Sequence, residues 1–223
     1  SVVRPFLAAW FITFLGKYLP LKGAELALGT VLFIFLYSSA LLYEHATKGI
    51  ANEFFINVGS IGSYDLEFGW VVDGLSIMMY FVVGTVSSLV FVYATNYMQG
   101  EIRYTFFFTS LTLFAGSMLV LVSSPTLLQL LIGWELVGVC SYLLIGHYWE
   151  KKENSSAAMK AFITTKIANI RLMIGIIVLA LSTKTIRISE ILYQSTHEYE
   201  EIKKEANLGV VILFIGTMGQ HDQ

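Results

Sequence analysis

The sequence predicts an all-α polytopic membrane protein with about seven transmembrane helices and one short β-hairpin between helices two and three. Of its 223 residues, 56% are hydrophobic and only 13% are charged, about half the charged fraction of an average soluble domain. The mean hydropathy is +0.68, and several apolar runs approach or exceed the ~20 residues that a helix needs to cross a bilayer. These observations place the chain in a membrane.

Seven apolar segments are predicted to span the bilayer, and the sequence ends soon after the seventh begins. The first segment is predicted to be broken near Gly16 and to end at Pro20. Pro125 separates the fourth segment from the fifth, because proline interrupts a helix interior. Residues 185–206 mix apolar with many charged side chains, which predicts a segment at the interface or in a loop. The seven segments are 2–19, 24–43, 71–95, 106–123, 127–149, 157–181 and 208–218.

The polar interval between the second and third segments is predicted to fold outside the membrane. In residues 54–68, FFINVGSIGSYDLEF, aromatic and β-branched residues flank Gly and Ser, a pattern typical of a hairpin. This interval carries one lysine, Lys48, among several acidic residues, whereas the loops at 17–22 and 151–152 each carry two lysines. Positive loops favour the matrix or cytoplasmic side, so we expect the hairpin on the opposite side.

One carboxylate, Glu135, lies near the middle of the fifth segment. An acid at the centre of an inserted helix costs roughly 2.5–3.5 kcal/mol on insertion scales, so such groups face a bundle interior or a water path and have a partner. The functional interpretation is a proton-carrying carboxylate close to a cation. The alternative is a structural, hydrogen-bonding glutamate.

The sixth segment supplies candidate cations for that partnership. At ~100° per residue, Lys166 points away from the helix face that is shared by Lys160, Thr164, Ile167 and Arg171. Lys160 is near the helix start, so it can extend to the interface as an anchor. Lys166 is deeper and needs a partner or water. A helix-five Glu with a helix-six Lys is a natural pair for holding and releasing a proton.

Several classes of function have no support in the sequence. One cysteine, Cys140, excludes an internal disulfide and a cysteine-based cluster. The four histidines lack the spacing of a metal site, and no glycine-rich nucleotide-binding motif is present. The net charge of −2 does not indicate nucleic-acid binding. We therefore expect no cofactor and no metal on this chain.

The segment GWELVGVCSYLLIGHYW at 133–149 resembles chain 5 of proton-pumping NADH:ubiquinone oxidoreductase, respiratory complex I. The resemblance covers nearly the whole chain and follows the family's order. It extends to Val72-Asp73-Gly74-Leu75-Ser76, MLVLVSSPTLLQLLIGW at 118–134, AAMKAFITTK at 157–166 and LFIGTMG at 213–219. It implies an antiporter-like membrane subunit, with residues 1–70 as two N-terminal helices plus the hairpin, and 71–223 as the start of the proton-translocating bundle.

The resemblance also implies which residues form the site, and it shows where this sequence differs from the family's pattern. Glu135 matches the family's helix-five glutamate, and Lys160 and Lys166 fall in its helix-six segment, so these three are the predicted proton-translocating residues. Asn169 stands where the family usually has Asp, and Gln220 where it has a helix-seven lysine. The family's later helices are absent, so we expect either a second polypeptide that carries the C-terminal half or a remainder outside this sequence.

The function implied is a membrane-arm subunit of NADH:ubiquinone reductase that translocates protons, with FMN, iron–sulfur clusters and ubiquinone in other subunits. Expected partners are other membrane-arm subunits and membrane lipids. The expected location is the mitochondrial inner membrane, with a bacterial plasma membrane as the alternative. Two other functions stay open: a structural or assembly subunit without its own proton path, and a subunit of a cation/proton antiporter.

Overall fold

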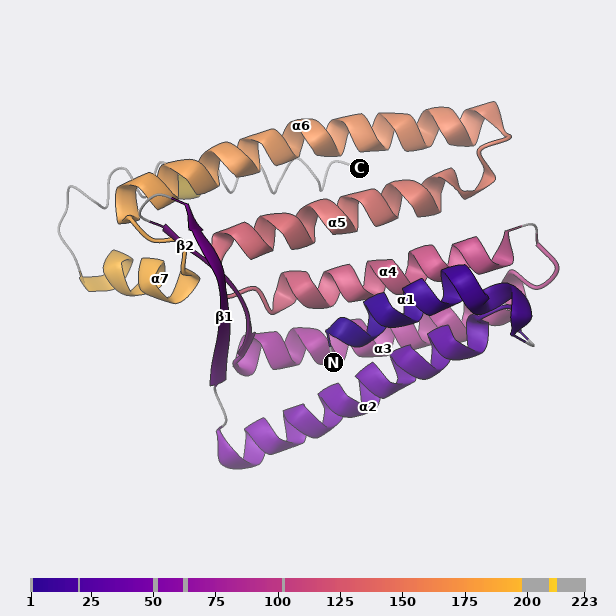
Figure 1. The fold of residues 1–223 in the computed structure, drawn as a ribbon, viewed down its shortest axis with the longest axis horizontal. Coiled ribbons are helices and arrows are strands. Elements are labelled where there is room, and N and C mark those ends of the chain that lie inside the picture. Colours follow the sequence, from indigo (N-terminus) through magenta and orange to yellow (C-terminus); the bar gives the residue numbers. More distant parts are fainter. Residues whose placement is uncertain are drawn as a thin grey trace. The chain divides into compact units, whose positions relative to one another are not determined.

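The computed structural model describes residues 2–19, 21–49, 52–61, 64–101, 103–197 and 209–211. Figure 1 shows the elements in chain order, from the indigo N-terminus to yellow. They are α1 (Val3–Leu15), η1 (Gly16–Tyr18), α2 (Ala24–Lys48), β1 (Asn52–Ile61), β2 (Tyr64–Val72), α3 (Gly74–Tyr97), α4 (Tyr104–Val122), α5 (Leu127–Ile145), η2 (Gly146–Tyr148), α6 (Lys152–Thr183) and α7 (Ile188–His197).

The predicted fold class is confirmed. Five of these helices, α2 to α6, are long and apolar enough to cross a membrane, and α1 is a shorter apolar helix. The two-stranded sheet of β1 and β2 lies between α2 and α3 in the sequence, where the hairpin was expected. Of the predicted seventh segment, 208–218, only 209–211 are described, and they are helical; the rest lies outside the described residues, as does Gln220.

Several boundaries differ from the prediction: α2 runs to Lys48 and not to residue 43, α3 begins at Gly74 because residues 71 and 72 belong to β2, and α5 ends at Ile145 and not at residue 149. The first apolar segment was expected to run to residue 19 with a break near Gly16, and this break is confirmed, because α1 ends at Leu15 and a 3-10 turn begins at Gly16. The sixth was expected to begin at residue 157, but α6 begins at Lys152 and runs for 32 residues. Glu153 in its first turn favours helix, since an acid there complements the helix dipole. At 1.5 Å per residue, α6 is ~48 Å long, more than the ~30 Å hydrocarbon core.

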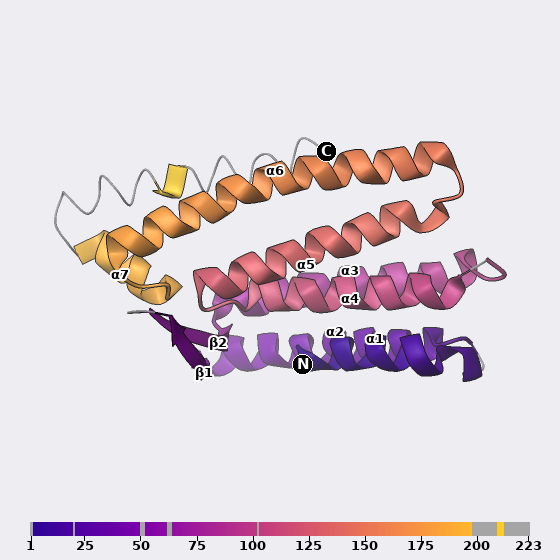
Figure 2. The same cartoon turned by 45° about the horizontal axis from the view of Figure 1, so that its top comes forward.

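The chain folds into two compact units, and the first comprises residues 1–52 and 71–123. Within it, α1 packs along α4 and α2 along α3, and Figure 2 shows α1 and α2 in one layer with α3 and α4 in the other. A close approach at Gly84 lets α3 reach α2, because a Cβ there would lie 3.0 Å from the Cα of Phe35. Phe91 and Phe108 are almost fully buried and meet edge to face at 6.0 Å.

The start of α3 is fixed by a cap that the sequence indicates. Asp73 is extended, and its carboxylate accepts a 2.7 Å hydrogen bond from the backbone N–H of Ser76. This satisfies one of the N–H groups that the first turn of a helix leaves without a partner. Many large apolar side chains point outward from these helices, among them Trp10, Leu36 and Leu89, which is the pattern of a lipid-facing surface.

The second unit comprises residues 53–70 and 124–223 and contains most of the hairpin with α5, α6 and α7. The helices α5 and α6 pack against each other, and Figures 1 and 2 show them side by side. Their shared core is apolar and includes Leu127, Leu172, Ile176 and Leu179, with Trp134 packed against it. This unit holds the predicted site residues.

Candidate functional site

The predicted pairing of Glu135 with a helix-six lysine is present in the structure. Glu135 on α5 and Lys166 on α6 form an ion pair between Oε2 and Nζ. Both side chains are partly buried, with 35% and 37% of their surface exposed. The Lys166 ammonium also lies 5.2 Å from the ring centroid of Phe162, one turn earlier on α6, a distance at which cation–π attraction acts.

Asn169 completes the surroundings of the carboxylate. Its Nδ2 donates a 2.8 Å hydrogen bond to Glu135 Oε1, so each carboxylate oxygen has one donor. Its Oδ1 accepts a 3.1 Å hydrogen bond from the indole N–H of Trp134. Because an indole N–H only donates, this contact fixes which end of the amide faces the carboxylate. Asn169 itself is buried, with 4% of its surface exposed.

The local sequence explains this arrangement. Lys166 and Asn169 are three residues apart and therefore share one face of α6. Trp134 and Glu135 are consecutive on α5, so the amide of Asn169 reaches both of them. The apolar cluster of the two helices packs beside this polar group and holds the helices at a fixed register. The site thus consists of four side chains from two helices.

The other predicted cations are not brought to Glu135. Lys160 and Arg171 are exposed on α6, as are Thr164 and Ile167, which confirms that these positions share a face distinct from that of Lys166. Among the described residues, the only ion-pair partner that the structure gives Glu135 is Lys166. The roles predicted for Glu135, Lys160 and Lys166 stay predictions, and only the first and third are in contact.

Every donor that the structure places on Glu135 is a nitrogen, from Lys166 and Asn169. A protonated carboxyl group has an O–H that needs an acceptor, and an ammonium and an amide N–H offer none. A proton on Glu135 therefore requires either a water molecule or a Lys166 amine that has given up its own proton. The geometry allows a proton to pass between the two groups, with a fixed amide beside them.

A second polar cluster in the same unit was not foreseen from the sequence. Arg187, just before α7, donates two 2.6 Å hydrogen bonds to Glu67 on β2, from Nε to Oε2 and from Nη2 to Oε1. Arg187 also lies over the ring of Phe55 on β1, 4.8 Å from its centroid. The Arg187 guanidinium hydrogen-bonds the Glu67 carboxylate and lowers its pKa below the usual value of 4.5, despite the opposing effect of burial.

The start of α5 is bonded to the same strand. The side chain of Gln129 accepts from the N–H of Gly69 and donates to its C=O, both at 2.9 Å and buried. Thr126 caps α5 by accepting from the N–H of Gln129, and its hydroxyl donates to the C=O of Glu67 at 3.3 Å. The hairpin is thereby fastened to α5 and to the segment before α7. The two partners of Glu67, Arg187 and Thr126, are 120 and 59 residues away in the sequence.

In the part of the chain that the structure describes, no group of three or more His, Cys, Asp or Glu side chains is arranged to hold a metal ion. Cys140 is buried in α5. The expectation that redox cofactors lie on other subunits stays a prediction.

Two protein-family models together match most of the chain. Residues 124–223 match the model described as NADH:quinone oxidoreductase/Mrp antiporter, TM. Residues 59–108 match the model described as NADH-Ubiquinone oxidoreductase (complex I), chain 5 N-terminus. The first match contains the complete Glu135 site, and the second includes β2 with Glu67, all of α3 and the start of α4.

Curated relatives agree with these matches. The chain is 43% identical over 140 residues to NAD(P)H-quinone oxidoreductase chain 5 of Synechocystis sp., covering 63% of this chain and 21% of the relative. It is 37% identical over 164 residues to NADH-quinone oxidoreductase subunit L of Escherichia coli, covering 74% of this chain and 27% of that relative. It is 35% identical over 208 residues to the chloroplastic NAD(P)H-quinone oxidoreductase subunit 5 of Zygnema circumcarinatum, covering 91% of this chain and 29% of that relative. The chain spans less than a third of these relatives.

Solved structures share the fold. A chain of the membrane-bound sulfane sulfur reductase, an archaeal respiratory membrane complex, superposes with a TM-score of 0.80 at 14% identity, covering 96% of this chain and 42% of that one. A chain of the Mrp complex from Dietzia sp. superposes with a TM-score of 0.75 at 18% identity, covering 96% of this chain and 23% of that one. With five membrane-spanning helices and these relatives, the protein is a multi-pass membrane protein. The chain is therefore a homologue of complex I chain 5, similar to the N-terminal part of that antiporter-like membrane subunit.

Proposed function

We propose that this chain is a membrane-arm component of a proton-translocating NADH–quinone oxidoreductase, and that Glu135 and Lys166 move the proton. The observation that carries the proposal is the Glu135–Lys166 ion pair between two apolar spanning helices. A charge pair inside a membrane segment is costly, and such groups mark ion and proton pathways. The names of the curated relatives support the choice of complex.

The proposed step follows from the contacts of the pair. A proton that arrives on Glu135 neutralises the carboxylate and removes its attraction to the Lys166 ammonium. Lys166 then turns to another acceptor, and a water molecule accepts from the O–H of the protonated Glu135. The return of Lys166 as an ammonium favours the charged carboxylate, which releases the proton to that water. Asn169 keeps its N–H on Glu135 Oε1 throughout, because Trp134 holds the other end of the amide. Lys160, exposed on the same helix, modulates the local potential from a distance.

Energy for this step comes from quinone reduction in other subunits, which carry FMN, iron–sulfur clusters and ubiquinone. The partners we propose are other membrane-arm subunits and a second polypeptide, or a continuation of this one, that carries the remaining helices. The proposed location is the mitochondrial inner membrane, with a bacterial plasma membrane as the alternative, since bacterial relatives exist.

The test measures proton translocation and electron transfer separately in the reconstituted assembly. Glu135→Gln and Lys166→Gln each remove one charge with little change of volume, and both should reduce protons moved per NADH oxidised while the assembled complex persists. Glu153→Gln is the matched control, because it removes an exposed acid from the first turn of the same helix α6. Normal proton yield in both site variants, with the complex intact, would contradict the proposal and favour a structural role.

Cation/proton antiport is the second candidate, because the family model matched over 124–223 describes both NADH:quinone oxidoreductase and Mrp antiporter proteins. The two functions differ in what accompanies the chain and in what drives transport. Co-purification with flavin and iron–sulfur subunits favours the oxidoreductase. Proton movement that depends on sodium and continues without NADH favours the antiporter.

A further inference from the structure

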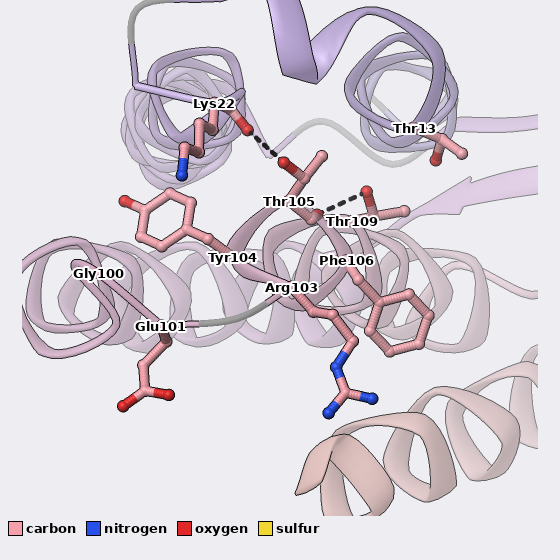
Figure 3. Close-up of a pocket in the computed structure, with 9 residues that line it drawn as sticks. All are labelled: Thr13, Lys22, Gly100, Glu101, Arg103, Tyr104, Thr105, Phe106 and Thr109. Atoms are coloured by element: carbon pink, nitrogen blue, oxygen red, sulfur yellow. Dashed lines mark hydrogen bonds between the residues drawn. The ribbon is translucent and has the colours of Figure 1, made fainter. Parts of the chain in front are cut away.

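A cavity of about 800 Å³ opens at one end of the first unit, where the loop between α1 and α2 meets the loop between α3 and α4. Figure 3 shows its lining. The loop between α1 and α2 is joined there to the first turn of α4, because Thr105 Oγ1 donates a 3.2 Å hydrogen bond to the C=O of Lys22. The lining residues are Thr13, Lys22, Gly100, Glu101, Arg103, Tyr104, Thr105, Phe106 and Thr109. A neighbouring cavity of about 370 Å³ shares Lys22, Gly100 and Tyr104 with it.

The cavity wall combines cations with hydroxyl groups. Lys22 and Arg103 supply positive charge from its two loops, and four lining residues carry hydroxyls. In Figure 3 the Lys22 ammonium points toward the Tyr104 ring, whereas the Glu101 carboxylate points away from it. Ammonium, guanidinium and hydroxyl groups are the side-chain donors that bind phosphate oxygens. The chemistry of this wall therefore suits a phosphate.

Both cations are held in an uncommon backbone conformation. Lys22 has φ +50° and Arg103 has φ +67°, in the left-handed region that few side chains other than those of Asn, Asp and His adopt. The side chains thus project from backbone positions that are set by the turns and not by a helix. Asn at either position would keep this backbone conformation and remove the charge.

The surroundings of the cavity are apolar and reach the membrane helices. Phe106 lies in its wall, and Trp10, one turn before Thr13 on α1, is 55% exposed. The described residues of the loops at 17–22 and 98–103 lie at the same end of this unit. The lysine distribution predicts that this end faces the matrix or cytoplasm. Anionic lipids attract basic groups at that surface, and basic pockets between spanning helices bind their headgroups.

We propose that this cavity binds the phosphate headgroup of an anionic phospholipid, with Lys22 and Tyr104 on one side and Arg103 on the other, and with its acyl chains along the exposed face of α1. The inference goes beyond proton translocation and does not depend on it. A lipid is the occupant, rather than free phosphate, because the polar wall is continuous with an apolar, lipid-facing helix surface.

The experiment uses the purified assembly in phosphatidylcholine vesicles that contain a trace of spin-labelled phosphatidylglycerol or, in parallel, spin-labelled phosphatidylcholine. We expect the protein to immobilise a larger fraction of the anionic lipid. The double substitution Lys22→Asn with Arg103→Asn should lower that preference about 25-fold, because each cation near the surface contributes roughly fivefold. Lys22→Arg should retain it.

Lys184→Asn is the matched control: it too is an exposed lysine with positive φ, +55°, and it does not line the cavity. Equal immobilisation of the two lipids by the unmodified protein overturns the proposal, as does an equal loss in the Lys184→Asn variant. Displacement of the labelled phosphatidylglycerol by inorganic phosphate at physiological concentration overturns the lipid as occupant, and its retention supports it. The wild-type comparison decides the matter even if the double variant fails to fold.

Discussion

Arg187 binds Glu67 through two parallel hydrogen bonds of 2.6 Å, which join the strand β2 to the segment that precedes α7. The side chain of Glu67 is largely buried, with 11% of its surface exposed, while the side chain of Arg187 is 37% exposed. A paired arginine fork of this kind fixes orientation as well as charge. The hairpin is therefore held in place by an ion pair, in addition to the backbone bonds at the start of α5.

Replacing Glu67 tests how much that pair stabilises the unit. Glu67→Gln should lower the free energy of unfolding by about 1–3 kcal/mol, because it leaves the Arg187 charge without its buried partner. Thermal unfolding of the purified protein in detergent measures this. The control is Glu190→Gln, since Glu190 contacts the same arginine at 3.2 Å but is exposed, and should cost less than about 1 kcal/mol. Equal effects would refute a special role for the buried pair.

Acidification should release the same contact. Arg187 holds the Glu67 pKa below 4.5 in the folded protein, so the stabilisation is fully present at neutral pH. It is lost as the pH falls below 4.5 and through the lowered folded value, since the unfolded carboxyl binds a proton first. Limited proteolysis of residues 52–72 as a function of pH should show this step. The step should be absent from Glu67→Gln, and its persistence there would assign it to another group.

The Gln129–Gly69 bonds give a prediction about the start of α5. Gln129→Met keeps the side-chain length but leaves the N–H and C=O of Gly69 buried without these partners. We expect a loss of about 2–4 kcal/mol in unfolding free energy, because a buried unsatisfied polar group costs ~1–3 kcal/mol. Gln194→Met on α7, where the side chain is only partly buried, should change stability little. Chemical denaturation of both variants measures the difference.

Asn169 allows a test of the site that leaves both charges in place. Asn169→Ala removes the hydrogen bond to Glu135 and the acceptor of the Trp134 indole. Proton translocation should fall roughly tenfold relative to NADH oxidation, which corresponds to about 1.4 kcal/mol for a lost charge-assisted bond. Asn154→Ala, at the beginning of the same helix, should leave the ratio unchanged. A normal ratio in Asn169→Ala would show that the amide does not orient the carboxylate.

Helix packing in the first unit predicts a contrast between two glycines. A Cβ on Gly84 would lie 3.0 Å from the Cα of Phe35, whereas a Cβ on Gly29 meets nothing within 4 Å among the described residues. Gly84→Ala should therefore destabilise by about 1–3 kcal/mol through overpacking. Gly29→Ala should be neutral or stabilise by up to ~1 kcal/mol, since alanine favours helix. Thermal unfolding distinguishes the two, and similar values would mean that α2 and α3 separate easily.

The sequence was sufficient for the parts of this protein that depend on local pattern. Apolar length predicted the spanning helices. Glu135 was predicted to pair with a cation, with Lys160 and Lys166 of helix six as candidates, because a membrane interior leaves a charge few alternatives. Lys160 was also predicted to take part, but it is exposed on a different face of α6 from Lys166. The helical period already places these two lysines on different faces. The extra turn at the start of α6 was missed because polar residues such as Asn154 and Ser155 are equally common in loops.

The remaining features depend on contacts between distant parts of the chain. From the sequence, Asn169 was notable only because the family usually has Asp at this position. Its hydrogen bond with Trp134 depends on the register of α5 against α6. Glu67 and Arg187 are separated by 120 residues, and each resembles an ordinary surface charge when considered alone. No period or motif links such residues, so only the folded arrangement reveals them.

The segments that flank α5 and α6 make one more constraint visible. At one end a short turn, η2, connects the two helices covalently. At the other end the N–H of Leu127 donates to the C=O of Ile186 at 2.9 Å, and the N–H of Ile188 donates to the C=O of Pro125 at 3.0 Å. The two helices are thus connected at both ends, by the chain itself at one end and by backbone hydrogen bonds between their flanking segments at the other. Sliding of α6 past α5 would break these bonds, so a change at the charge pair must come from side-chain rotation or from a twist of α6 about its own axis.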